Sequence, residues 1–247
     1  MLKKISPLLT FLAILVVWEA GTRLGKVPEF ILPAPSVVAA ASVGMTPGAW
    51  FSNIFATLYV ALAGFFLALA VSLVIAISMV LTPQLRRNVY PILVVIHSTP
   101  IVAIAPIIVV MLGTGNLSRI SITFLIAFFP LVVSGVTGML DAPEEVIELS
   151  RSLRASDMRE VVGLRLPYAV SHIFAALKVS VTLSVIGAVV AEFVAANEGL
   201  GYMIMFATSN FRMPFAFASL AILVVISLGL FGLVTLVQRT FFRWSLP

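Results

Sequence analysis

The chain contains no cysteine, only two histidines and few charged residues. Without cysteine it forms no disulfide framework and no thiolate metal site, and it has no thiol nucleophile. Only 10% of its 247 residues are charged, whereas soluble domains carry about 25%. So few charges cannot coat a water-facing surface, which excludes a water-soluble enzyme. Intrinsic disorder is excluded as well, because it requires low hydrophobicity and high net charge.

Catalytic and nucleotide-binding motifs are also missing. The sequence has no His-Glu-x-x-His string and no serine elbow, and its histidines are His97 and His172. The nearest string to a P-loop, Gly21 to Lys26, has the wrong spacing. The basic residues are scattered rather than clustered, which argues against a nucleic-acid partner. We therefore expect no enzymatic activity in this chain and no cofactor bound by it.

What the sequence has in abundance is apolar residues, at 61% of the chain with a mean hydropathy of +1.17. This composition predicts an all-α polytopic membrane protein, since a spanning helix needs about 20 apolar residues. The first of six apolar stretches is marginal in length and resembles a signal-peptide core, but no cleavage site follows it closely, so we expect a retained helix. The six stretches are Pro7–Ala20, Ile54–Leu81, Val89–Leu112, Ile120–Leu140, Tyr168–Ala195 and Phe215–Val237.

Lysine and arginine positions predict the orientation, because basic residues concentrate in cytoplasmic loops. With the amino terminus in the cytoplasm, ten basic residues lie inside and four outside, which favours both termini in the cytoplasm. Lys178 falls within the fifth stretch and is counted on neither side. The proline-rich segment Leu32–Pro35 predicts an external elbow, with Pro35 near the first turn of a following helix.

One substantial hydrophilic segment, Asp141–Pro167, holds six of the ten acidic residues and four arginines. Asp141 is predicted to cap a first helix and Ser156 a second that ends at Leu164, with Glu148 and Arg151 one turn apart on the first. The charges could simply solvate a loop. The alternative is a docking element, because the apolar residues of this segment have no core of their own to bury them.

The spacing within this segment resembles the signature loop of bacterial binding-protein-dependent ABC importer permeases. That signature reads Glu-Ala-Ala, three residues, Gly, nine residues, Ile-x-Leu-Pro, and it matches Glu148 to Pro167 at every interval. Arg154 replaces the family glycine, so the turn has either a strained left-handed residue or a different shape. Leu32–Pro35 and the stretch from Leu177 to Tyr202 resemble the branch that carries nitrate, sulfonate, taurine, bicarbonate or related small organic molecules.

The resemblance implies that residues 1–247 form one transmembrane permease domain in the bacterial inner membrane, with a coupling loop at about 141–167. It implies a second permease copy, giving a homodimer, together with an extracytoplasmic solute-binding protein and the lipid bilayer. Two ATP-binding subunits would hold ATP and magnesium and receive the loop. The coupling residues would be Glu148, Leu149, Ser150, Arg151, Arg154, Ala155, Leu164, Leu166 and Pro167.

Polar residues at membrane depth are candidates for the solute path or its gate, because they usually face a cavity or a partner. Each also has a structural reading: a proline-associated kink at His97–Pro100, close helix packing near Thr182, a carbonyl contact for Lys178 and a structural or gating role for Glu192. An ion-coupled secondary transporter without an ATPase is the alternative function, and only Glu192 and His97 could serve its coupling ion. The candidates are His97, Ser98, Thr99, Lys178, Thr182 and Glu192.

Overall fold

The computed structural model describes residues 2–245, with side chains from Leu9 onward, and all regular elements in that range are helical. A π-helical turn, Val161–Arg165, joins α8 to α9, and a 3-10 turn, Arg243–Ser245, follows α11. The helices are α1 Leu2–Leu24, α2 Pro35–Val43, α3 Pro47–Leu81, α4 Pro83–Ser98, α5 Ile101–Leu112, α6 Asn116–Leu140, α7 Glu144–Ser152, α8 Asp157–Glu160, α9 Leu166–Ala195, α10 Leu200–Ser209 and α11 Met213–Phe241.

Four helices in the described range are long and apolar enough to cross a membrane. They are α3, α6, α11 and the continuous helix Asp157–Ala195, which combines α8, the π-helical turn and α9. The pair α4 and α5 makes a fifth span if the two count as one. These confirm the predicted all-α membrane class. The predicted first stretch, Pro7–Ala20, lies within α1, whose side chains are described only in part, so the predicted total of six depends on that helix.

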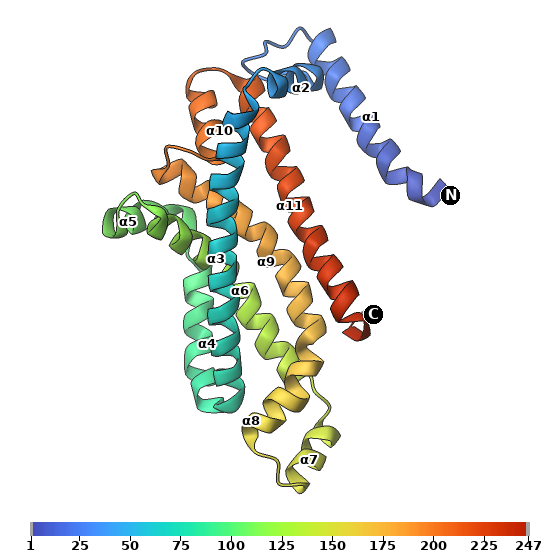
Figure 1. Ribbon diagram of the computed structural model, residues 1–247, viewed down its shortest axis with the longest axis vertical. Coiled ribbons are helices and arrows are strands. Elements are labelled where there is room, and N and C mark those ends of the chain that lie inside the picture. The colour runs from blue at the N-terminus through green and yellow to red at the C-terminus, as the bar shows by residue number, and fades with distance from the viewer. Residues whose placement is uncertain (1, 246–247) are drawn as a thin grey trace.

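The predicted third stretch, Val89–Leu112, is not one straight helix. It breaks between α4 and α5, whose axes differ by 95°. Pro100 has no N–H and disfavours helical geometry at the residue before it, and Thr99 is extended with ψ 129°. The predicted interruption at His97–Pro100 is confirmed, and it is a sharp corner that sends α5 sideways from the bundle (Figure 1).

Helices α3, α6 and α9 form the centre of the bundle because small residues let their backbones approach closely. A Cβ added at Gly187 of α9 would lie 2.9 Å from Thr123 Cα of α6, and one added at Gly138 would meet Ala169 Cα at 3.0 Å. Ser180 and Ser184 of α9 are fully buried. This agrees with the packing interpretation of the small hydroxyl residues in the fifth stretch.

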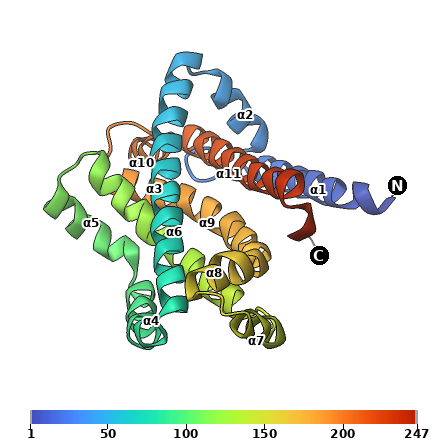
Figure 2. The ribbon, with the colours of Figure 1, turned by 60° about the horizontal axis from the view of Figure 1, so that its bottom comes forward.

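The bundle has two distinct ends (Figures 1 and 2). At one end lie α2, the start of α3 and α10, and at the other α7 and α8 project beyond the long helices. Helix α2 begins at Pro35, which confirms the predicted elbow and helix start. Helix α1 diverges from the bundle and is tied to α2 through Glu19, whose carboxylate accepts a hydrogen bond from Ser36 N at 3.0 Å.

Candidate functional sites: the polar hairpin, the Gly199 turn and the aromatic pocket

The polar hairpin, defined here as Glu144–Arg165, consists of α7, a tight turn, α8 and the π-helical turn. Helix α7 begins after Pro143, so the predicted cap at Asp141 is wrong. Asp141 instead ends α6, and its Oδ2 lies 3.3 Å from His172 Nε2. Ser156 precedes α8 as predicted, but α8 continues into α9 without a break. The second arm of the hairpin is therefore one piece with a membrane-crossing helix.

The turn of the polar hairpin is centred on Arg154, whose φ is +56°. This is the left-handed region, which costs a non-glycine residue roughly 1 kcal/mol or more. Three backbone hydrogen bonds close the turn, including Arg154 N to Arg151 O at 2.9 Å and Ala155 N to Ser150 O at 3.1 Å. Of the two shapes left open by the sequence, the chain adopts the strained one, and Arg154 takes a conformation that glycine would adopt freely.

A buried carboxylate clamps the two arms of the hairpin together. Glu160 is 5% exposed and accepts hydrogen bonds from Arg151 Nε at 3.2 Å and from Arg165 Nε at 2.8 Å. Arg165 also reaches Met139 O of α6 at 3.3 Å. Two guanidinium groups therefore share one buried carboxylate. Arg151 thus pairs with Glu160 rather than with Glu148.

Four large apolar side chains are exposed on the hairpin, among more numerous charged and polar ones. Leu149, Leu153, Met158 and Val162 are between 52% and 76% exposed. Glu148 lies exposed on the same helix as Leu149. The structure therefore places Glu148, Leu149, Arg151 and Arg154 at the surface. It leaves Ser150, Ala155, Leu164, Leu166 and Pro167 half-buried beneath it.

The predicted path residues lie in two places, the end of α4 and helix α9, and within residues 9–245 no hydrogen bond or ion pair joins any two of them. The exposed His97 ring stacks on Phe129 of α6, with centroids 4.0 Å apart. The Ser98 and Thr99 hydroxyls donate to the carbonyls of Val94 and Val95, at 2.8 and 3.1 Å, as the kink interpretation expects. Thr182 and Lys178 of α9 are half-buried. The Thr182 hydroxyl donates to Val179 O, whereas Lys178 has no hydrogen-bond or ion-pair partner in the described part of the chain.

Glu192 is fully buried at the end of the bundle opposite the hairpin. It belongs to the Gly199 turn, defined here as Gly199–Gly201 together with the three side chains that accept from its amides. Asn53 Oδ1 accepts from Gly199 N at 2.8 Å, Thr57 Oγ1 from Leu200 N at 2.8 Å and Glu192 Oε2 from Gly201 N at 2.6 Å. These amides are at the start of α10, where N–H groups lack partners within the helix.

Sequence reasoning placed Gly199–Tyr202 in the stretch that resembles one branch of the family, and the structure shows a turn there with φ +116° at Gly199. It missed α10 itself, because a helix of 10 residues is too short for the membrane-span criterion. It also missed Asn53 and Thr57. The sequence did contain a pattern that could have identified them, because two hydrogen-bonding side chains four residues apart share one face of an otherwise apolar helix.

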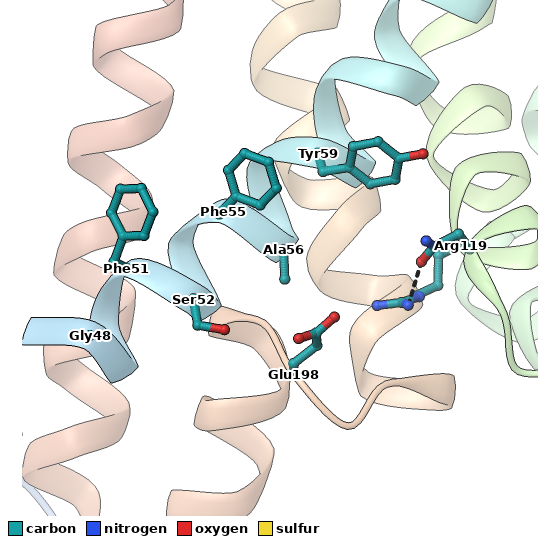
Figure 3. A pocket seen from close by; sticks show the side chains of 9 residues that line it. Gly48, Phe51, Ser52, Phe55, Ala56, Tyr59, Arg119 and Glu198 are labelled. Atoms are coloured by element: carbon teal, nitrogen blue, oxygen red, sulfur yellow. Dashed lines mark hydrogen bonds between the residues drawn. The ribbon is translucent and has the colours of Figure 1, made fainter. Parts of the chain in front are cut away.

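A third feature, the aromatic pocket, was not predicted. It is a cavity of about 540 Å³ between the first turns of α3, the first turn of α6 and the loop before α10 (Figure 3). Phe51, Phe55 and Tyr59 line it from α3, and Arg119 and Glu198 line it from the other two segments. The spacing of the three rings, four residues apart, was a readable signal on the sequence.

Residues 68–243 match the model for the binding-protein-dependent transport system inner membrane component. The chain belongs to this family. It is therefore the membrane component, or permease, of a transport system, and its role is transport rather than enzymatic catalysis.

Relatives align with this permease over nearly its whole length. It is 34% identical to the riboflavin transport system permease protein RibX of Chloroflexus aurantiacus, over 96% of this chain and 88% of that one. It is 32% identical to a probable ABC transporter permease protein of Haemophilus influenzae, over 99% of both chains. The formylaminopyrimidine transport permease protein ThiX of Halalkalibacterium halodurans is 29% identical, over 97% of this chain and 96% of that one.

Solved structures confirm the fold of the permease. A chain of the inward-facing MetNI methionine ABC transporter superposes with a TM-score of 0.68 at 19% sequence identity. The match covers 82% of this chain and all of the other one. At that identity the likeness establishes the fold class predicted from the sequence.

Proposed function

We propose that this permease forms the solute path of an ATP-driven importer in the bacterial inner membrane. Two ATPase subunits, which hold ATP and magnesium, bind the polar hairpin from the cytoplasm, and both termini of the permease lie on that side. A solute-binding protein delivers solute at the opposite end of the bundle. Residues 1–247 act as one transmembrane domain, and the path lies between two copies of it.

The observation that carries the proposal is the exposed face of the polar hairpin. Leu153 and Leu149 are 76% and 61% exposed on a segment that projects past the long helices (Figure 1). Apolar surface in such a position favours a protein partner, since water solvates it poorly. The Glu160 clamp and the continuity of α8 with α9 give this face a rigid connection to the membrane helices.

Two further surfaces support a second copy of the permease. Helix α1 leaves its own bundle with Val16 and Val17 66% and 71% exposed. Helix α5 leaves the other side of the bundle after its 95° corner, with Val110 85% exposed. Within one copy α5 packs one face on α6 and α9 through Ala105, and α1 contacts α11 through Trp18 and Phe217. A homodimer supplies a partner for the faces that these contacts leave exposed.

Two solute chemistries are consistent with the relatives. Some are named for ring compounds, riboflavin and formylaminopyrimidine. Others, at 26% identity, are named for aliphatic sulfonates and taurine. We propose a small organic solute from this range.

The test of the coupling role is Glu148→Ala in the permease reconstituted in liposomes with its ATPase and solute-binding proteins. We expect the solute transported per ATP hydrolysed to fall about tenfold, which corresponds to about 1.4 kcal/mol. The matched control is Glu145→Ala, which removes another exposed carboxylate from α7 and should leave the ratio unchanged. Equal coupling and equal ATPase assembly in both variants would contradict the proposal.

A further inference from the structure

The aromatic pocket lies at the end of the bundle opposite the polar hairpin, where an importer receives its solute (Figures 1 and 3). Its volume of about 540 Å³ falls within the roughly 300–1,000 Å³ of sites that bind drug-sized molecules. A two-carbon zwitterion would fill only a small part of it. The small side chains of Ser52 and Ala56 lie between its aromatic edge and its polar edge.

The aromatic edge is a run of three rings on one face of α3. Phe51, Phe55 and Tyr59 are 71%, 62% and 48% exposed. The rings of Phe51 and Phe55 are nearly parallel, at 18°, with centroids 6.5 Å apart. Exposed parallel rings form a surface on which another flat ring can stack, an arrangement worth about 0.5–1.5 kcal/mol per pair beyond the area buried.

The polar edge carries one positive and one negative group. Arg119 Nη2 donates to Asn116 Oδ1, which fixes the guanidinium, while Arg119 Nε is buried with no hydrogen-bond partner. The Glu198 carboxylate points into the same space (Figure 3), and within the described residues it forms no ion pair with Arg119. Arginine can only donate hydrogen bonds and an ionised carboxylate can only accept them. The edge is therefore complementary to a ligand that offers an acceptor beside a donor.

We propose that the aromatic pocket binds a planar heteroaromatic solute, which stacks on Phe55 and its neighbours and presents a carbonyl or ring nitrogen to Arg119 and an N–H to Glu198. This rests on the proposed import function and selects the ring compounds from the two solute chemistries considered above. A lipid tail would cover the rings but pair with neither charged group. A small aminosulfonate would pair with the charges but leave the rings exposed.

The experiment is equilibrium dialysis with the permease and its ATPase subunits in lipid nanodiscs. The probes are riboflavin, 4-amino-2-methylpyrimidine and taurine. We expect saturable binding of at least one ring compound, with a Kd at least tenfold below that of taurine. Arg119→Gln and Glu198→Gln should each raise that Kd about tenfold, and Phe55→Ala should raise it severalfold. The control is Phe66→Ala, which removes an equally exposed ring of α3 outside the pocket, at 59% exposure, and should leave the Kd unchanged.

The comparison of probes uses the unaltered protein. It therefore tests whether the pocket prefers ring compounds to taurine even if a variant fails to fold. Failure of both ring compounds to bind, or equal binding of taurine, overturns the assignment. Equal effects of Phe66→Ala and Phe55→Ala overturn it as well. Suppose that one of these results is obtained, but Glu148→Ala still lowers the solute transported per ATP hydrolysed. The pocket assignment is then refuted and the proposed function is not. A permease that never assembles with ATPase subunits refutes the proposed function.

Discussion

At the residue scale, the Gly199 turn depends on the absence of a side chain at two positions. A Cβ at Gly199 would clash with the Glu192 carboxylate, and one at Gly201 would lie 2.8 Å from Glu192 Oε2. The buried carboxylate can therefore reach the amide of Gly201 because nothing stands between them. The backbone at Gly199, with φ +116°, also lies in a region that L residues rarely adopt.

Gly199→Ala should lower the free energy of unfolding by about 2 kcal/mol, because it adds backbone strain to a clash with Glu192. The measurement is thermal unfolding of the detergent-solubilised chain. Gly232→Ala is the control, since an added Cβ there meets nothing within 4 Å, and it should be neutral or slightly stabilising. Equal stability of the Gly199 and Gly232 variants would show that the turn tolerates a side chain.

Single residues were predictable where the constraint is local. The kink at Pro100 follows from its missing N–H, whereas for the turn at Arg154 the sequence left two shapes open and the structure decides for the left-handed one. The cap at Asp141 was mispredicted because Pro143, two residues later, is the residue that precedes α7. The partner of Arg151 was missed because Glu160 lies nine residues away and approaches only when the hairpin folds.

At the element scale, the stability of the polar hairpin rests on the Glu160 clamp. Glu160→Ala should destabilise the hairpin by about 3 kcal/mol, because it leaves the buried guanidinium of Arg165 without its counter-charge. Amide hydrogen exchange across residues 144–160 should accelerate accordingly. Glu145→Ala, at an exposed carboxylate on α7, serves as the control and should leave exchange unchanged. Slow exchange in both variants would mean that packing alone holds the hairpin.

The long elements were predicted well because hydropathy marks them directly. The stretch Ile120–Leu140 falls within α6 and Tyr168–Ala195 within α9, each with a few more residues at its start. The predicted start of the second stretch, Ile54, misses the first two turns of α3, which carry Trp50, Phe51 and Asn53. That omission hid the aromatic pocket and the Asn53 contact, since both depend on helix beyond the purely apolar run.

At the scale of the whole molecule, orientation can be tested with the native sequence because it contains no cysteine. Leu153→Cys, at a 76% exposed position of the polar hairpin, should react with a membrane-impermeant maleimide only after the inner face becomes accessible. Thr46→Cys, exposed at the opposite end, should react from outside in intact cells. Bound ATPase subunits should protect Leu153→Cys and leave Thr46→Cys reactive. The reverse labelling pattern would invert the predicted topology.

The helix Asp157–Ala195 runs unbroken for 39 residues, roughly 58 Å at about 1.5 Å per residue, and carries the Glu160 clamp near one end and the Glu192 contact near the other. A continuous helix can couple a change at either of its ends to the other end. Suppose that nucleotide binding to the proposed ATPase subunits changes the affinity for solute near the Gly199 turn by some factor. Thermodynamic reciprocity then requires that solute binding there changes the affinity of the ATPase subunits for nucleotide by the same factor. Solute binding at the end of the bundle opposite the hairpin would thus change the affinity of the ATPase subunits for ATP. The helix alone would transmit this effect.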